Sequence, residues 1–213
     1  MLIGLILAAG QGSRFGSDKR QALLPSGQSL LEHAITEYAA ACDKLFVVTG
    51  DQDGFAQQLC AQHGAHQAIN PHAQQGMGLS LACGIQSMLN APDAELIEGV
   101  IVGLADMPGV TRSIIKDVGQ ALRHLQQQGH TAQAVAPSYQ GQLGHPRGIP
   151  RSLFGALSQL TGDQGAKAVI NWAQAKHLPV DDAGVLMDID TPQNLAQFKG
   201  PERSPPAVAH PCP

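Results

Sequence analysis

The stretch Leu2-Ile-Gly-Leu-Ile-Leu-Ala8 is a continuous run of apolar and small residues, and Ala9-Gly-Gln-Gly-Ser-Arg-Phe-Gly-Ser-Asp-Lys19 follows it directly. A short, uninterrupted apolar run is typical of a parallel strand that is buried on both faces. Small residues after such a strand let backbone N–H groups approach a phosphate or a base edge closely. The start of the chain therefore predicts a buried strand that leads into a ligand-binding loop.

Along the rest of the chain, apolar runs typical of strands alternate with segments of helical spacing. Further strands are expected at 45–49, 66–69, 99–104, 131–137 and 178–180. Helices are expected at 29–41, 54–63, 77–89, 111–128, 151–160, 165–175 and 193–198. Ser29 and Glu32 form a predicted capping box at the first of these helices. This alternation predicts the α/β class, as a single three-layer αβα domain with a mostly parallel, open, Rossmann-like sheet.

Composition separates this domain from the end of the chain. The 213 residues are 43% hydrophobic and 14% charged, which is ordinary for a globular protein. Residues 200–213 are rich in proline and poor in apolar side chains, so we expect a disordered tail there and a folded domain over 1–199.

Charge and cysteine content narrow the class of partner and the compartment. The net charge of −4 and the lack of a basic run argue against binding to nucleic acid or to anionic membranes, although a small anionic substrate remains compatible. The four cysteines show no C-x-x-C spacing, which favours reduced thiols. The apolar amino terminus has no basic residues before it, and no other run approaches the roughly 20 residues of a membrane span. We therefore expect a cytoplasmic protein.

Aspartates occur at two later points in the chain where an expected strand or helix begins or ends. Asp106 comes after the expected strand 99–104, and Asp188-Ile-Asp190 precedes the last expected helix. Ligands of open α/β sheets bind beyond the carboxyl ends of the strands, where a hard cation takes one or two carboxylates together with phosphate oxygens. A turn-capping role is the alternative for Asp106.

The spacing of the first loop excludes two familiar phosphate-binding motifs. Gly10 and Gly12 are followed by Phe15 where a dinucleotide fingerprint needs glycine, and Lys19 lacks the preceding glycine of a P-loop. Arg14 and Lys19 nevertheless supply charge suited to a triphosphate. A tight strand-to-helix turn without a ligand is the alternative interpretation.

The pattern L-A-A-G-x-G-x-R-x-G-x-x-K resembles the signature of nucleotidyltransferases with a glycosyltransferase-A-like fold. Further segments are similar, in the same order, to molybdenum cofactor cytidylyltransferases of the MobA- and MocA-like group. These segments are Gly76-Met-Gly-Leu-Ser-Leu81, Ala105-Asp-Met-Pro108, Gly144-His-Pro146, Gly162-Asp-Gln-Gly-Ala-Lys167 and Asp188-Ile-Asp-Thr-Pro192. The resemblance covers nearly the whole chain to about residue 199.

This resemblance implies a nucleotide site in the first loop. The implied nucleotide-binding residues are Leu7, Ala8, Ala9, Gly10, Gly12, Ser13, Arg14, Lys19 and Ser80. Arg14, Lys19 and Asp106 are the implied catalytic residues. For Ser80, a helix N-cap is the alternative.

The resemblance also implies a metal site and an acceptor site. Asp106 would be the principal Mg²⁺ ligand and Asp190 the second, while Asp188 would support either the metal or only the loop. His145 would lie beside the acceptor, a buried structural histidine being the alternative. Lys167 would also bind the acceptor, although relatives usually have arginine there, and lysine cannot hold a phosphate bidentately.

The implied reaction transfers a nucleoside monophosphate from an NTP to a phosphorylated acceptor. Ala9 favours CTP over GTP, because guanylyltransferases of the molybdenum cofactor pathway resemble L-A-G-G at this turn, with glycine at the position of Ala9. The implied acceptor is molybdopterin, with transient contact to a molybdoenzyme or its chaperone. Another phosphorylated acceptor or another NTP is the first alternative, and Arg147-Gly-Ile149 after the G-H-P element departs from typical relatives. A non-catalytic cofactor carrier is the second alternative.

Overall fold

The computed structural model of the chain describes residues 1–10, 15–198 and 200. The strands are β1 Leu2–Leu7, β2 Lys44–Thr49, β3 His66–Ile69, β4 Gly99–Leu104, β5 Val135–Tyr139, β6 Gln142–Leu143, β7 Arg147–Pro150 and β8 Lys176–Pro179. The α-helices are α1 Leu30–Ala39, α2 Gly54–His63, α3 Met77–Leu89, α4 Arg112–Gln127, α5 Phe154–Leu157 and α6 Pro192–Gln197.

One sheet runs through the molecule in the order β3-β2-β1-β4-β7-β5-β6, and β8 pairs with β5. Strands β1 to β4 pair in parallel, as predicted, whereas β7 lies antiparallel between β4 and β5. Strand β7 was not predicted, because Arg147-Gly-Ile-Pro150 contains glycine and proline and shows no alternation. Strand β8 pairs in parallel with β5, so the predicted, mostly parallel open sheet is confirmed, with antiparallel pairing confined to β7 and β6.

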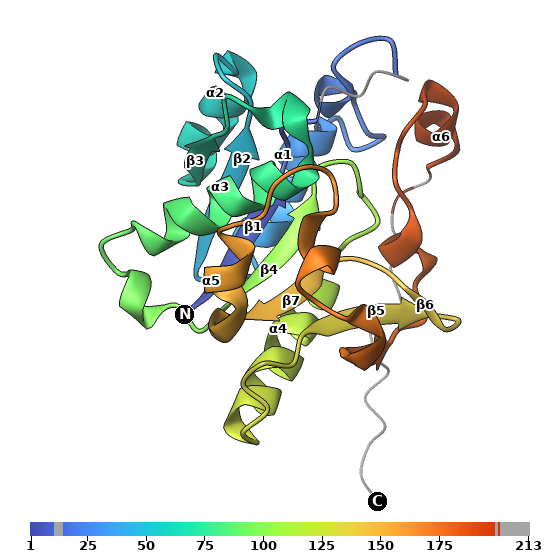
Figure 1. Cartoon of the computed structure of the whole chain (residues 1–213). Helices are drawn as coiled ribbons and strands as arrows, with labels where there is room; N and C mark the ends of the chain where they lie inside the picture. The colour runs from blue at the N-terminus through green and yellow to red at the C-terminus, as the bar shows by residue number, and fades with distance from the viewer. Residues whose placement is uncertain (11–14, 199, 201–213) are drawn as a thin grey trace, which may run out of the picture.

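Helices cover both faces of the sheet, so the predicted three-layer α/β architecture is confirmed (Figure 1). Helices α1, α2 and α4 share one apolar core with β1, which includes Ile6, Ile35 and Val118. Helices α3 and α5 share a second core on the opposite face, with Leu5 and Ile85 among its fully buried residues.

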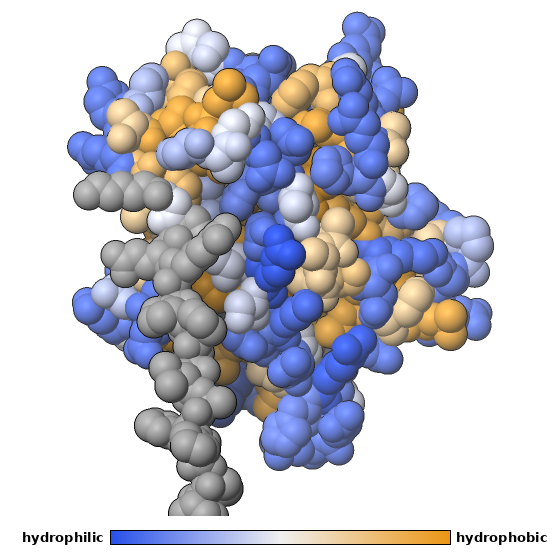
Figure 2. Space-filling view, turned by 180° about the vertical axis from the view of Figure 1, so that it is seen from behind, coloured by the Kyte–Doolittle hydropathy of each residue, from blue (hydrophilic) through white to orange (hydrophobic). Residues whose placement is uncertain are grey.

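The amino-terminal half follows the sequence closely, and local capping explains its boundaries. The Ser29 hydroxyl accepts a hydrogen bond from the Glu32 amide, and the Glu32 carboxylate accepts one from the Ser29 amide, as the capping box predicted. Pro192 opens α6, with Thr191 as its N-cap. Helix α4 turns an apolar stripe toward the sheet, and its far end forms the hydrophilic lower end of the molecule in Figure 2.

The carboxy-terminal half departs from the predicted boundaries. The strand expected at 131–137 is β5, and the strand expected at 178–180 is β8. The helix expected at 151–160 is a 3₁₀ turn followed by the single turn of α5. The helix expected at 165–175 is two separate 3₁₀ turns, Gly165–Ala168 and Trp172–Gln174. Asn171 has extended backbone between them and caps the second turn, because its side-chain oxygen accepts a hydrogen bond from the Ala173 amide.

None of the helices in the described ranges combines the length and apolar character that a membrane span requires. The tail expected over 200–213 lies outside the described residues, apart from Gly200, so the domain boundary at 199 stays a prediction.

Candidate active site

A cavity of about 490 Å³ opens where the carboxyl ends of β1 and β4 meet the start of α3. Its described lining consists of Leu7, Ala9, Gly10, Lys19, Ala73, Gln74, Gly76, Met77, Ser80, Leu104, Asp106 and Asp163. A smaller adjoining cavity of about 50 Å³ is lined in part by Ala8 and Arg20. Of the predicted nucleotide-binding residues, Gly12, Ser13 and Arg14 lie outside the described residues.

The start of α3 forms one wall of the large cavity. Gly76 is the N-cap residue with a φ of 122°, and a Cβ atom built there would lie 2.3 Å from Asp163 Oδ1 and 2.4 Å from the Gly162 backbone. Only glycine allows this close approach of two loops. Ser80 lies inside the helix, where its buried hydroxyl accepts a hydrogen bond from the Asn70 side chain at 3.1 Å. The alternative of Ser80 as an N-cap is therefore wrong.

Lys19 joins two carboxylates from distant parts of the chain. Its ammonium lies 2.6 Å from Asp106 Oδ2 and 2.9 Å from Asp190 Oδ1. Burial opposes the charge on Lys19, but the hydrogen bonds to Asp106 and Asp190 outweigh it and raise the lysine pKa. The turn-capping alternative for Asp106 fails, because its side chain faces Lys19 and the N-cap of the next helix is Thr111.

The polypeptide around Asp190 is held against the end of β4 by backbone contacts. The Ile189 amide donates to the Asp106 carbonyl at 2.8 Å, and the Ile189 side chain is fully buried. Upstream, Gly184 packs on Gly109 so closely that a Cβ atom on Gly109 would lie 2.5 Å from the Gly184 Cα atom. These contacts bring Asp190 opposite Asp106. Asp188, on the same segment, is exposed to solvent.

One oxygen of Asp106 has no partner among the described residues. Its Oδ1 atom is buried and accepts no hydrogen bond, whereas Oδ2 binds Lys19. A buried carboxylate oxygen without a partner carries a desolvation cost, which a bound cation would remove. The site therefore has the features of a divalent-metal site: two carboxylates from separate segments, one of them with an unsatisfied oxygen.

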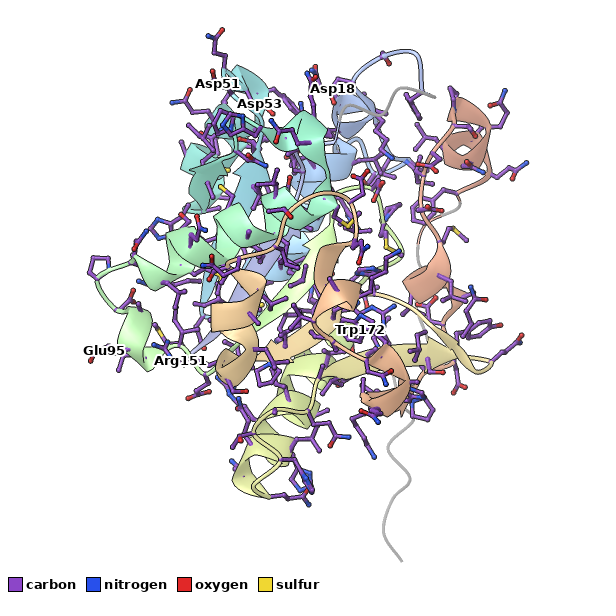
Figure 3. All side chains as sticks on the ribbon, in the orientation of Figure 1. Asp18, Asp51, Asp53, Glu95, Arg151 and Trp172 are labelled. Atoms are coloured by element: carbon purple, nitrogen blue, oxygen red, sulfur yellow. The ribbon has the colours of Figure 1, made fainter. Side chains whose placement is uncertain are left out.

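Arg20 fixes the end of the first loop, a role that the sequence analysis missed. Its guanidinium donates to the Ala8 carbonyl at 2.9 Å, to Asp18 at 2.7 Å and to Asp53, the N-cap residue of α2. Asp18 and Asp53 lie at the same end of the molecule in Figure 3. Burial opposes the charge on Arg20, but these carboxylates prevail and raise its pKa. Because Arg20 binds both β1 and α2, it positions the neighbouring Lys19.

The two predicted acceptor-binding residues lie in different surroundings. His145 is half-buried before β7, and its amide donates to the Val185 carbonyl at 2.8 Å. Burial, reinforced by the charge of Arg147, lowers the His145 pKa to about 4, so the ring is neutral at pH 7. Lys167 is exposed on a shallow depression beside Trp172. Neither His145 nor Lys167 is among the described residues that line the large cavity.

The fold, together with the family match described next, defines a nucleotidyltransferase of the glycosyltransferase-A-like class. The chain belongs to the family described as the MobA-like NTP transferase domain, whose profile matches residues 4–179. That membership implies an NTP as substrate and a phosphorylated acceptor.

Three relatives illustrate the breadth of the similarity. Nicotine blue oxidoreductase of Paenarthrobacter nicotinovorans is 27% identical over 204 residues, which cover 90% of this chain and 93% of that protein. The 2-C-methyl-D-erythritol 4-phosphate cytidylyltransferase of Psychrobacter cryohalolentis is 32% identical over 120 residues, or 55% of this chain and 41% of that protein. Rv0371c from Mycobacterium tuberculosis, solved in complex with manganese, has a TM-score of 0.68 at 23% identity, covering 92% of this chain and 96% of that one.

Proposed function

We propose that the protein transfers CMP from CTP to the terminal phosphate of molybdopterin, in a Mg²⁺-dependent reaction that releases pyrophosphate. The observation that carries this proposal is the juxtaposition of Lys19, Asp106 and Asp190 at the edge of the large cavity. Two carboxylates that can bind a cation lie beside a cavity formed by the loop after a strand. This arrangement suits a nucleoside triphosphate and its metal ion.

The chemistry needs positioning and charge neutralisation more than a base. An oxygen of the acceptor phosphate forms a bond to the α-phosphorus of the NTP while the bond from that phosphorus to the bridging oxygen of pyrophosphate breaks. The acceptor oxygen is already ionised at neutral pH, so no side chain has to remove a proton. Lys19 and Arg14 bind the β- and γ-phosphates in this proposal, and their charges stabilise the leaving pyrophosphate.

The residues present fit a divalent cation. Asp106, with its unpartnered Oδ1 atom, and Asp190 would hold the ion, which supplies positive charge at the α-phosphate. Carboxylate oxygens are hard ligands, so Mg²⁺ or Mn²⁺ suits them better than a soft metal. Asp188 is exposed on the same segment, and its role, as support of the metal or only of the loop, stays a prediction.

The preference for CTP rests on Ala9 and on the cavity beside it. Ala9 lies two residues after the end of β1 and lines the cavity, as do Ser80 and Met77 from α3. The methyl group of Ala9, where glycine would have only a hydrogen atom, narrows the space beside the backbone that would contact the base. The narrower space favours the smaller pyrimidine ring. The partial match to a cytidylyltransferase is consistent with this choice.

The choice of molybdopterin rests on the segments that resemble molybdenum cofactor cytidylyltransferases, Gly144-His-Pro146 among them. The neutral His145 ring is suited to hydrogen bonding with an acceptor rather than to pairing with its charge.

Pyrophosphate release tests this proposal directly. The purified chain is incubated with Mg²⁺, each of the four NTPs in turn, and either molybdopterin or another phosphorylated acceptor. We expect release with CTP and molybdopterin above all other pairs, and none from Asp106→Asn. Release with CTP and only a different acceptor would reject molybdopterin, and release with GTP alone would reject the cytidylyl assignment.

A further inference from the structure

Arg147 is a partly buried cation whose charge is not neutralised by the described residues. It begins β7, and its guanidinium carbon lies 4.5 Å from the centroid of the Trp172 ring. The Nη1 atom is buried and has no hydrogen-bond partner, and Nη2 reaches only the Leu143 carbonyl at 3.4 Å. None of the ion pairs within the described ranges includes Arg147.

A buried guanidinium without a carboxylate is costly. Burial lowers the Arg147 pKa to about 10, which still leaves it charged at neutral pH. Stacking on an aromatic ring compensates only part of the lost hydration, because the ring supplies no hydrogen-bond acceptor for the N–H groups. The other half-buried arginines among the described residues have acceptors for their N–H groups: Arg20 binds Asp18 and Asp53, and Arg151 binds the Ala94 and Ile97 carbonyls. Within the described ranges, Arg147 is the half-buried arginine that leaves a buried N–H group without an acceptor.

A second unsatisfied polar atom lies in the same place. The His145 Nδ1 atom is buried without a partner, and Arg147 is close enough to affect the charge of the ring. The neutral His145 ring has one N–H group, which the Val102 backbone engages, so Nδ1 can only accept a hydrogen bond. An anionic oxygen would therefore satisfy the N–H groups of Arg147 and not the His145 nitrogen.

The position of Arg147 relates it to the large cavity. Arg147 pairs with Val102 of β4, the strand that leads to Asp106. Val102 belongs to the core on the α3 and α5 side, and Trp172 and Leu7 pack against the same core. Leu7 also lines the large cavity, so cavity and cation share one face of the sheet. In Figure 3, Trp172 lies beside β5 in the lower right of the view, whereas Asp51 and Asp53 lie at the upper left.

We propose that Arg147, stacked on Trp172, binds an anionic oxygen-bearing group of the acceptor, remote from the phosphate that reacts. This inference rests on the proposed nucleotidyl transfer and adds to it a residue that determines acceptor specificity. The group is a carboxylate or a second phosphate, since both present two oxygens to the guanidinium fork. Arg147 retains partial exposure, which lets such a group approach it.

The chain contains a single tryptophan, so its fluorescence reports on the surroundings of Trp172, which include Arg147 and the depression that holds Lys167. The wild-type chain, without nucleotide or metal, is titrated with inorganic phosphate and separately with acetate, at ionic strength held constant by chloride. We expect a saturable change in Trp172 emission with at least one of the two anions. Arg147→Met should weaken the apparent affinity roughly 10- to 100-fold, the range for losing a charge-assisted hydrogen bond.

Two further variants make the result specific. Lys176→Met removes one positive charge from exposed β8, near Trp172 in sequence, and should leave the titration unchanged. Arg147→Lys keeps the charge and loses the planar fork, so it should bind at an intermediate affinity. If Arg147→Met does not fold, Arg147→Lys still tests the inference. The inference is overturned if the wild-type emission does not respond, if Arg147→Met responds like wild type, or if Lys167→Met alone abolishes the response.

A kinetic measurement separates this inference from the proposed function. In the pyrophosphate assay, Arg147→Lys should raise KM for the acceptor and leave KM for the NTP unchanged. Failure of every NTP and acceptor pair to release pyrophosphate would reject the proposed function, while the fluorescence titration would still stand as a test of the anion subsite.

Discussion

Replacing Lys19 by alanine should strengthen the binding of Mn²⁺ in the absence of nucleotide, although it weakens the use of NTP. The Lys19 ammonium lies between Asp106 and Asp190, at 2.6 and 2.9 Å from their oxygens. A divalent ion that uses both carboxylates must displace it. Without nucleotide the displaced ammonium has no phosphate to bind, so it competes with the metal.

The size of the effect follows from the burial of the three side chains. Lys19 and Asp106 are 12% and 22% exposed, so their contact is of the order of a charged hydrogen bond, about 1.5–3 kcal/mol. Asp190 is 41% exposed, so its contact is screened and contributes about 0–1 kcal/mol. A net gain of about 2 kcal/mol in metal binding corresponds to roughly 30-fold in affinity.

Mn²⁺ titration followed by electron paramagnetic resonance or calorimetry measures this affinity without any turnover. Lys116→Ala provides the matched control, because it removes the same charge from an exposed position on α4. With CTP present the order should reverse, and Lys19→Ala should lose a few kcal/mol of transition-state stabilisation. Unchanged or weaker Mn²⁺ binding by Lys19→Ala, relative to both wild type and Lys116→Ala, would refute the competition.

Three other predictions test separate parts of the site. Asp106→Asn should abolish transfer while the variant still folds, because the side chain lies outside the apolar cores; near-normal pyrophosphate release by a folded variant would remove Asp106 from the metal site. Ala9→Gly should relax the CTP preference over GTP by at most about 10- to 200-fold, the ceiling for one small group in a pocket, as competition assays would reveal. Between pH 6.5 and 4 the unfolded chain takes up a proton on His145 that the folded chain refuses, since the folded pKa is about 4. The free energy of unfolding should therefore fall as pH decreases through that window, by about 2–3 kcal/mol more in wild type than in His145→Gln. Urea titrations at pH 7 and at pH 4.5 measure this loss for each protein, and an equal loss in the two proteins would contradict the assignment.

Local patterns in the sequence were sufficient for the elements of the amino-terminal half. The apolar run Leu2–Leu7, the capping box at Ser29 and the helical spacing of 77–89 can each be recognised from residues that are close in the chain. Strand β7 could not be predicted in this way. Its Gly148 packs against Val118 and Val135, and its pairing with β4 joins segments about fifty residues apart, so only the assembled sheet stabilises it.

The sequence by itself determined the chemistry that is available: an apolar strand followed by small residues and a lysine, and isolated aspartates after later strands. It did not determine which of these side chains meet. The contact between Lys19 and Asp190 spans 171 positions, and it exists because the Ile189 amide binds the Asp106 carbonyl at the end of β4. The sequence likewise could not show that the charge of Arg147 is not neutralised. The burial of Arg147 and the absence of a described carboxylate partner depend on the residues that surround it in the folded protein. A residue's type is fixed locally, whereas its desolvation and its neighbours are set by packing between distant segments, and these decide its charge and its ligand.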